Sequence, residues 1–282
     1  MPAQLLDGKV IAERIKAEIK QEVEQLKAKH GKGPSLAAVQ VGKNEASAVY
    51  IKSQMNNANK LGIEYKLHEL DAAMTQKQVS DYIEGLNKDN SVTGIILQMP
   101  LPAAINAKEL QGVISLKKDV ESIRPCTAMA AMELINSTGI DLYGKEAVVV
   151  GHSEIVGKPV ASMLLERFAT ITICHIGTGQ AGTLPEHVKR AEILVVAVGK
   201  PGLVKGEWIK EGAVVVDVGI NKVGDKIVGD VEFEEAAKRA AYITPVPGGV
   251  GPLTVTMLMR NTVEAFKAQI TAGDTMNAQN DK

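Results

Sequence analysis

Four short apolar runs in the second half of the chain constrain its fold most strongly. They occupy residues 147–150, 171–174, 193–198 and 214–218, are rich in β-branched side chains, and each is followed by a glycine or a turn. Strands that alternate with helices pair in parallel, because each helical crossover returns the chain to the same edge of the sheet. This half is therefore predicted to form a mainly parallel sheet with a ligand crevice at the carboxyl ends of its strands.

The first half of the chain shows the same alternation of helix and strand patterns. Its apolar residues recur either at helical spacing or in short continuous runs that suit strands buried on both faces. The expected elements are a helix at 10–26, a strand at 36–41, a helix at 47–61, a helix around 79–86 and a strand at 93–98.

The helix expected at 47–61 and the strand expected at 93–98 carry polar residues of interest. Ser47 is a residue type that caps helices, and Gly62 suits the left-handed position that ends one. Tyr50 and Gln54 stand one turn apart on this helix, while Gln98 stands at the carboxyl end of the strand. In a parallel sheet that end borders the ligand crevice.

Length and pattern together predict an α/β protein of two domains. The chain has 282 residues, 45% of them hydrophobic, which is enough for two cores. A helix at 127–135 could join the two series, and the last helix, at 255–266, is expected to pack on the first domain. The predicted domains are 1–124 plus 253–282, and 125–252.

Composition argues against several classes of partner. The 32 basic and 33 acidic residues leave a net charge of -1, so no global field favours nucleic acid or an anionic membrane, and aromatic residues are only 3% of the chain. No uncharged run approaches membrane-spanning length. Cys126 and Cys174 lack metal-ligand spacing and read as small buried hydrophobes. We expect a cytoplasmic protein without metal, nucleic acid or membrane.

A glycine turn follows the first strand of the second series. Gly151 and Gly157 flank it, and a helical pattern starts directly after Gly157. Such a turn exposes backbone amides at a helix N-terminus, where a pyrophosphate binds. Ser153 replaces the middle glycine of the dinucleotide-binding motif, so a tight turn without a ligand stays an alternative.

The segment after the next strand bears on the choice of cofactor. In this position an acidic residue usually holds the ribose hydroxyls of NAD, or a basic residue holds the 2′-phosphate of NADP. Residues 174–178 contain no Lys or Arg, which weakens the case for NADP. They also contain no Asp or Glu, so the usual marker of NAD is missing as well, and NAD is favoured only by the first absence. His152 and His175 could both approach the ribose, or could be ordinary loop residues.

Several segments, in order along almost the whole chain, carry a family resemblance. They are residues 41–47 with Tyr50, 97–102, 118–120, 219–221, 228–231 and, least broken of all, 242–252. Together they resemble the methylenetetrahydrofolate dehydrogenase/cyclohydrolase family.

This resemblance implies an N-terminal α/β folate-site domain and a Rossmann-like dinucleotide-binding domain, with the active site in a cleft between them. The implied reaction is oxidation of 5,10-methylenetetrahydrofolate to 5,10-methenyltetrahydrofolate by hydride transfer to NAD or NADP. A homodimer is implied, and a partner enzyme of one-carbon metabolism is conceivable.

The resemblance also assigns site residues. Tyr50 would stack on the pterin, Gln98 would lie beside the reacting ring, and Pro247, Gly248 and Gly249 would line the folate pocket. The cofactor contacts would be Gly151, His152, Ser153, Ile155, Val156, Gly157, His175, Ile176, Gly199 and Ile220.

The chain departs from the family pattern at two catalytic candidates. Gln54 stands where most members carry the lysine that serves the cyclohydrolase step, and Gln cannot exchange a proton near neutral pH. Lys52 points to a different helix face and is a poor substitute. Glu121 replaces the usual Asp, and the connection after it is shortened. We therefore predict a dehydrogenase whose cyclohydrolase activity is weak or absent.

Two other interpretations stay open. The chain could be an ordinary bifunctional dehydrogenase/cyclohydrolase in which another base aids Gln54. It could also be a non-catalytic folate- or nucleotide-binding subunit of a larger complex, which the shortened connection after Glu121 keeps possible.

Overall fold

The computed structural model describes residues 2–121 and 125–280, with the side chains of 45–46 and 273–280 outside the description. None of the described helices combines the length and the apolar composition that crossing a membrane requires.

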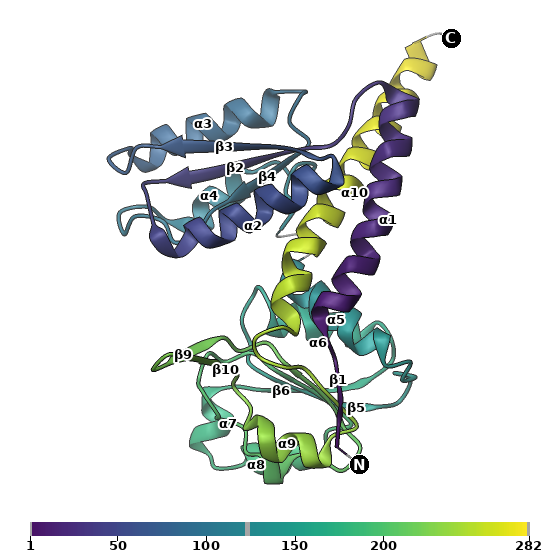
Figure 1. Cartoon of the computed structure of the whole chain (residues 1–282). Helices are drawn as coiled ribbons and strands as arrows, with labels where there is room; N and C mark the ends of the chain where they lie inside the picture. The colour runs from purple at the N-terminus through teal and green to yellow at the C-terminus, as the bar shows by residue number, and fades with distance from the viewer. Residues whose placement is uncertain (1, 122–124, 281–282) are drawn as a thin grey trace. The chain divides into compact units, whose positions relative to one another are not determined.

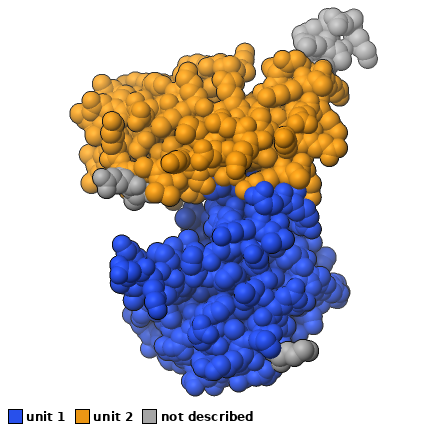
Figure 2. Space-filling model, in the orientation of Figure 1, with its two compact units in different colours: residues 1–14, 125–257 blue, residues 15–124, 258–282 orange. Residues whose placement is uncertain are grey.

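Packing divides the chain into two compact units (Figure 2). Unit 1 comprises residues 1–14 and 125–257, and unit 2 comprises residues 15–124 and 258–282. The domain limits predicted from the sequence stay a prediction.

Unit 2 is built on a three-stranded parallel sheet in the order β3-β2-β4 (Figure 1). Every residue of the central strand β2 is buried, because β2 has a neighbour on each side and apolar side chains of α3 and α4 pack on one face. The predicted helices and strands of the first half are confirmed. The bounds are α1 (Gly8–His30), β2 (Ser35–Val41), α2 (Glu45–Leu61), β3 (Glu64–Leu70), α3 (Gln76–Lys88), β4 (Gly94–Leu97) and α4 (Ala107–Val113).

The predicted start of α2 is wrong. The helix begins at Glu45, so Ser47 lies in its first turn and is not the cap. The Ser47 hydroxyl donates to the Asn44 carbonyl at 2.9 Å and accepts from Gln40 Nε2 at 3.3 Å, so it serves the loop and the neighbouring strand. The predicted end is correct, since Gly62 has φ +75°.

Unit 1 is built on a six-stranded parallel sheet in the order β1-β11-β8-β7-β5-β6. All four predicted strands are present, and the chain places β6 on one side of β5 and β7 on the other. The position between β5 and β7 is therefore the switch point at which ligands of such sheets bind. The strands are β1 (Gln4–Leu5), β5 (Glu146–Val150), β6 (Thr170–Cys174), β7 (Ile193–Val196), β8 (Val214–Asp217) and β11 (Tyr242–Ile243).

The helices of unit 1 connect these strands, and an antiparallel hairpin of β9 and β10 follows β8. Cys126 and Cys174 are both buried, as expected. The bounds are α5 (Cys126–Ser137), α6 (Gly157–Leu165), α7 (Ile176–Gln180), α8 (Leu184–Arg190), the 3-10 helix η1 (Gly206–Trp208), β9 (Asn221–Val223), β10 (Lys226–Val228), α9 (Phe233–Arg239) and α10 (Val250–Asn280).

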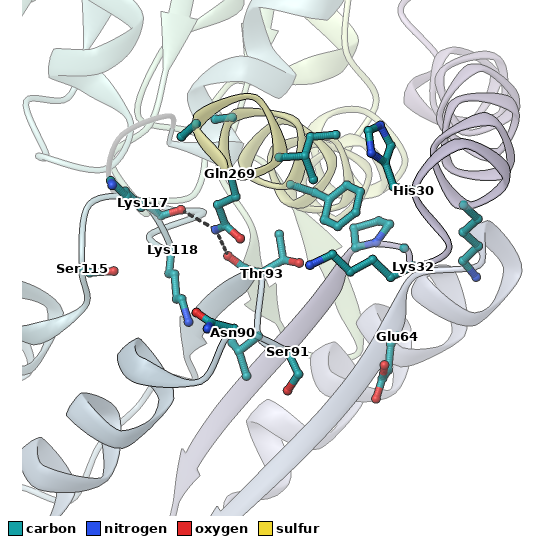
Figure 3. Close-up of a pocket in the computed structure, with 18 of the residues that line it drawn as sticks. His30, Lys32, Glu64, Asn90, Ser91, Thr93, Ser115, Lys117, Lys118 and Gln269 are labelled. Carbon is teal, nitrogen blue, oxygen red and sulfur yellow. Dashed lines mark hydrogen bonds between the residues drawn. The ribbon is translucent and has the colours of Figure 1, made fainter. Parts of the chain in front are cut away.

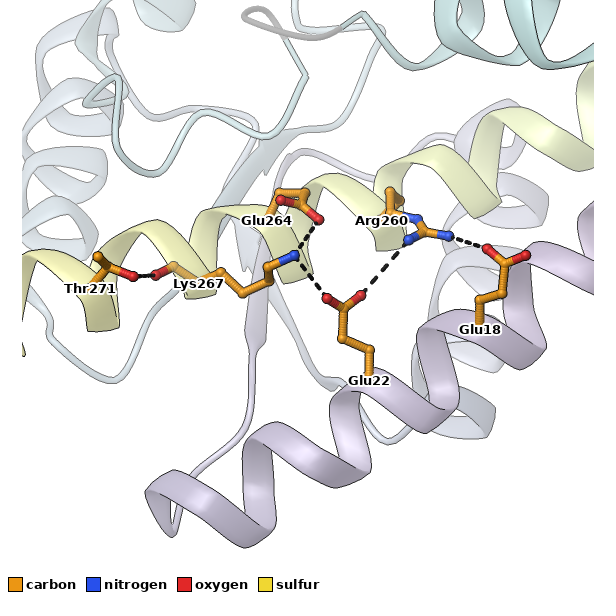
Figure 4. A network of polar contacts seen from close by, with 6 residues as sticks. All are labelled: Glu18, Glu22, Arg260, Glu264, Lys267 and Thr271. Atoms are coloured by element: carbon orange, nitrogen blue, oxygen red, sulfur yellow. Dashed lines mark hydrogen bonds and ion pairs between the residues drawn. The ribbon is translucent and has the colours of Figure 1, made fainter. Parts of the chain in front are cut away.

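Within unit 2, α10 packs along α1 through an ion-pair network (Figure 4). Arg260 Nη2 contacts Glu18 at 2.8 Å, and Lys267 Nζ contacts Glu22 at 2.8 Å and Glu264 at 2.9 Å. The prediction that the last helix returns to pack on the first series is confirmed from residue 258 onward.

Candidate active site

Two buried glutamines meet at the carboxyl edge of the unit 2 sheet. Gln98 directly follows β4, and its backbone N–H donates to Val39 O at 2.8 Å, while Gln54 comes from α2. Gln98 Nε2 donates to Gln54 Oε1 at 3.0 Å, and Gln54 Nε2 donates back to Gln98 Oε1 at 3.4 Å. Only 3% of Gln98 and none of Gln54 is exposed. Gln54 lies on a helix and Gln98 at the end of a strand, as the sequence predicted, and the structure shows that their side chains are hydrogen-bonded to each other.

Tyr65 is a member of this cluster that the sequence analysis missed. Its hydroxyl donates to Gln54 Oε1 at 2.9 Å from the neighbouring strand β3. Burial raises the pKa of Tyr65, so the hydroxyl remains protonated and keeps donating. Gln54 Oε1 therefore accepts two hydrogen bonds, which fixes the orientation of a neutral amide. The only sequence signal was the scarcity of aromatic residues.

Tyr50 lies one turn before Gln54 on α2, as predicted, and is half-buried. Lys52 is exposed while Gln54 is buried, which confirms that the two side chains occupy different faces of the helix. Lys52 therefore does not replace the missing lysine at position 54.

Glu121 follows a segment that lies beside β4. An isolated parallel bridge pairs Asp119, two residues before Glu121, with Ile95 of β4. The Glu121 backbone N–H donates to Asp119 Oδ1 at 3.0 Å. Burial, with a smaller contribution from the Asp119 carboxylate, raises the pKa of Glu121 to about 7. Residues 122–124, which include the shortened connection, lie outside the described residues.

A basic hollow of about 970 Å³ occupies the opposite edge of this sheet, where Thr93 precedes β4 (Figure 3). Two of its lysines have a structural explanation, because they stand at helix C-termini whose carbonyls attract cations. Lys118 Nζ donates to Leu86 O at 2.9 Å and to Asp89 O at 2.5 Å, at the end of α3, and Lys27 lies in the last turn of α1. We therefore exclude this hollow from the candidate site.

In unit 1, two glycines shape the loop after β5. Gly151 has φ +124°, and a Cβ there would stand 2.3 Å from Ala197 O. A Cβ on Gly157 would stand 2.1 Å from Gly151 O. Both positions therefore require glycine. Ser153, at the altered motif position, accepts from the Val156 and Gly157 backbone N–H groups at 3.2 and 3.4 Å, so it helps to start α6.

The predicted cofactor contacts gather at the carboxyl edge of the unit 1 sheet. They lie in the loops after β5, β6, β7 and β8, which share one edge because these strands are parallel. Three large apolar side chains are exposed there: Ile155 at 65%, Ile176 at 76% and Ile220 at 67%. Exposed apolar groups at a switch point suit the flat rings of a dinucleotide. Val156 and Gly157 are buried and shape the loop itself.

Two buried aspartates that the sequence analysis did not single out hold these loops. Asp230 is fully buried and accepts from the Val198, Gly199 and Lys200 backbone N–H groups at 2.7, 2.9 and 2.8 Å. Asp230 thereby fixes Gly199, a predicted cofactor contact. The sequence signal was present, since Asp230 belongs to the matching segment 228–231.

The second aspartate, Asp217, ends β8. Its carboxylate accepts from the Gly219, Asp230 and Val231 backbone N–H groups at 2.9, 3.0 and 2.9 Å. Burial raises the pKa of Asp217 to about 6 although these three hydrogen bonds oppose the shift. The contact to Gly219 orients the loop that carries Ile220.

The Pro-Gly-Gly run also lies in unit 1, beside Ile220. Pro247, Gly248, Gly249 and Ile220 line one hollow of about 220 Å³. A Cβ on Gly8 would stand 1.7 Å from Gly249 O, so the start of α1 packs directly on this run. The structure thus brings three predicted folate contacts next to a predicted cofactor contact. Among the residues described, no three or more His, Cys, Asp or Glu side chains cluster as metal ligands would.

A parallel sheet with a glycine turn at its switch point, joined to a second α/β unit, defines a two-unit α/β dinucleotide-binding protein. Family comparisons identify which one. Residues 6–121 match the catalytic domain of tetrahydrofolate dehydrogenase/cyclohydrolase, and residues 125–270 match its NAD(P)-binding domain. The chain belongs to the tetrahydrofolate dehydrogenase/cyclohydrolase family.

Relatives match over nearly the whole chain. Bifunctional protein FolD of Moorella thermoacetica is 50% identical, covering 95% of this chain and 100% of that protein, and that of Nitratiruptor is 45% identical, covering 94% and 98%. Bifunctional FolD of Campylobacter jejuni superposes with a TM-score of 0.90 at 41% identity, covering 95% of this chain and 99% of that chain. The Trypanosoma brucei enzyme, solved with NADP and an inhibitor, gives 0.90 at 37% identity, covering 96% and 99%.

These matches confirm the predicted two-domain α/β fold with a Rossmann-like domain, the enzyme class of methylenetetrahydrofolate dehydrogenase and the NAD(P) type of cofactor.

Proposed function

We propose that the principal reaction of this chain is oxidation of 5,10-methylenetetrahydrofolate to the 5,10-methenyl cation, with a weaker hydrolysis of that product. The observation that carries the proposal is the buried Gln54–Gln98 pair at the carboxyl edge of the unit 2 sheet, in two signature positions of the family.

The oxidation needs alignment more than proton transfer, because loss of a hydride leaves a cation spread over two folate nitrogens. Tyr65 and Gln54 hold the Gln98 amide in one orientation, so its position is set before substrate arrives. Among the residues described, Gln98 Oε1 accepts only the long 3.4 Å bond from Gln54 and can still face positive charge in the product. Tyr50, half-buried one turn away, would stack on the pterin.

NAD or NADP, when bound at the glycine loop of unit 1, supplies the hydride acceptor. Gly151 and Gly157 let the loop approach the strand edge closely, and Asp217 and Asp230 fix the neighbouring loops. The exposed isoleucines of these loops would cover the rings and exclude water.

The hydrolytic step is where the chain departs from its family. The relatives are named bifunctional, which supports the alternative interpretation better than a dehydrogenase without hydrolase activity. Gln54, a fixed neutral amide, cannot exchange the proton that activation of water requires. Glu121, whose pKa is raised to about 7, can exchange protons near neutral pH and is the base that we propose assists.

A second candidate function is a dehydrogenase without any hydrolysis, which the fixed Gln54 amide favours. Four further expectations stay predictions: contact of Pro247, Gly248 and Gly249 with folate, a homodimeric state, a partner enzyme and a cytoplasmic location.

Two assays on the purified chain test these functions. Reduction of NAD or NADP with methylenetetrahydrofolate as donor is expected, and its absence with both cofactors would favour a non-catalytic binding subunit. Decay of methenyltetrahydrofolate is expected to exceed that of a buffer blank. Decay equal to the blank would leave the dehydrogenase proposal standing and refute the hydrolytic one.

A further inference from the structure

The loops after β5 and β6 carry two histidines whose geometry bears on cofactor choice. We propose that His175 selects NAD over NADP by donating its Nε2–H to the adenosine ribose. This inference rests on the proposed dehydrogenase function, and it concerns a choice that family membership leaves open, since one solved relative holds NADP.

Two hydrogen bonds fix His175 directly after β6. Its backbone N–H donates to Thr178 Oγ1 at 3.2 Å, and its ring Nδ1 accepts the Gly177 backbone N–H at 3.1 Å. A ring nitrogen that accepts carries no proton, so the ring proton of this tautomer stands on Nε2. His175 therefore presents one fixed donor and is exposed.

His175 occupies the place where dinucleotide-binding folds contact the ribose. In such folds the residue at the end of the second strand, about 20 residues after the glycine turn, recognises the 2′ position. His152, on the loop after β5, stands beside it with ring centroids 5.5 Å apart. One ring of this pair belongs to the glycine loop and the other to the position that contacts the ribose, so the two positions lie side by side.

These two loops offer a 2′-phosphate no Lys or Arg side chain that lacks an ion-pair partner. Residues 151–158 and 174–180 contain one lysine and no arginine. That lysine, Lys158, is ion-paired with Glu154. The side chain next to His175 is Ile176, which is 76% exposed and would remove water from a phosphate without replacing its hydrogen bonds. A ribose 2′-hydroxyl, in contrast, can accept from a neutral Nε2–H.

Binding of nucleotide fragments tests the selection apart from catalysis. Isothermal titration of the whole chain with 5′-AMP and with 2′,5′-ADP compares the two ribose forms directly. We expect 5′-AMP to bind roughly tenfold more tightly than 2′,5′-ADP. A difference of this size is expected when one hydrogen bond is lost and a phosphate is desolvated. Equal affinity, tighter binding of 2′,5′-ADP, or no binding of either nucleotide would overturn the proposal.

Two variants assign the effect to the histidines. His175→Asn keeps an oxygen that can accept the Gly177 N–H but lacks the Nε2 donor, so 5′-AMP should bind roughly fivefold more weakly while 2′,5′-ADP changes little. His152→Arg adds a fixed cation on an exposed loop and should tighten 2′,5′-ADP roughly tenfold. His30→Asn, in unit 2, is the matched control.

Unchanged 5′-AMP affinity in H175N, with a wild-type thermal midpoint, would remove His175 from the selection. If H175N is unstable, H152R still decides, because a failure to improve 2′,5′-ADP binding would show that the ribose lies elsewhere. Failure of the proposed function is separate, since it would appear as no reduction of either NAD or NADP with the folate donor.

Discussion

Gln98 Nε2 donates to Gln54 Oε1 at 3.0 Å, and Gln54 Nε2 returns the bond to Gln98 Oε1 at 3.4 Å. This reciprocal pair is fully packed and accepts a further bond from Tyr65. A neutral pair of this kind can position a substrate, but it cannot move a proton near neutral pH. The balance between the two family reactions therefore depends on position 54.

Gln54→Lys is expected to increase hydrolysis of methenyltetrahydrofolate at least tenfold, since positioned acid–base groups typically contribute that much or more. Tyr65 and Gln98 can accept from the new ammonium, so the variant should fold. Oxidation of methylenetetrahydrofolate should not increase. Initial rates of both reactions provide the comparison, and Lys52→Gln is the control for charge on α2. Unchanged hydrolysis in Gln54→Lys would contradict the role given to position 54.

Gln98→Leu should lower the free energy of unfolding by about 1–3 kcal/mol, because it leaves the buried Gln54 amide with an unpaired donor. The same substitution should reduce the oxidation rate. Gln54→Leu combined with Gln98→Leu should cost at least about 1 kcal/mol less than the two single changes added together. Urea unfolding of the three variants measures this coupling, and simple additivity would mean that the pair is not a unit.

Much of this architecture is predictable from the sequence, because long apolar periodicities and β-branched runs depend on local spacing alone. The strands at 147–150 and 214–218, the left-handed Gly62 and the position of Gln98 at a strand end follow from such patterns. The start of α2 does not. Ser47 is a residue type that caps helices, but its hydroxyl accepts from Gln40 of β2, and helical spacing does not register a contact between a strand and the next helix.

The rest of the site depends on contacts between distant residues. Tyr65 of β3 donates to Gln54 of the preceding helix α2, and Asp230 accepts from the backbone amides of residues 198–200 in a separate loop. The short edge strand β1 pairs with β11 over two residues only, which is too little for periodicity to register. These features follow from the packed sheet, so the sequence pattern alone did not indicate them.

Glu121 should make stability depend on pH. Its folded pKa of about 7 lies above its ordinary value of 4.5, so the folded chain holds the proton more tightly than the unfolded chain between these values. Stability should therefore fall as pH rises from about 4.5 through 7, by at most about 3 kcal/mol.

Glu121→Gln should remove this dependence, so the free energy of unfolding of wild type relative to E121Q should decrease over that window. Urea unfolding at several pH values tests it, with Glu24→Gln at an exposed site on α1 as the control. A constant difference between wild type and E121Q would mean that burial does not perturb this carboxyl.

Asp230→Asn should destabilise unit 1 by about 3 kcal/mol, since an amide nitrogen would face backbone donors that now bind a carboxylate. It should also raise the KM for the nicotinamide cofactor, because Gly199 loses its anchor. Asp225→Asn, on the exposed β9–β10 turn, is the matched control. Equal thermal midpoints for D230N and D225N would argue against the anchoring role.

Above all, we propose that this chain oxidises a folate-borne one-carbon unit with a nicotinamide cofactor. The most direct measurement follows nicotinamide reduction and methenyl formation together, with methylenetetrahydrofolate as donor and NAD and NADP supplied separately. We expect equal amounts of reduced cofactor and methenyl product at early times, with NAD the better acceptor. No reduction of either cofactor by a folded chain would contradict it.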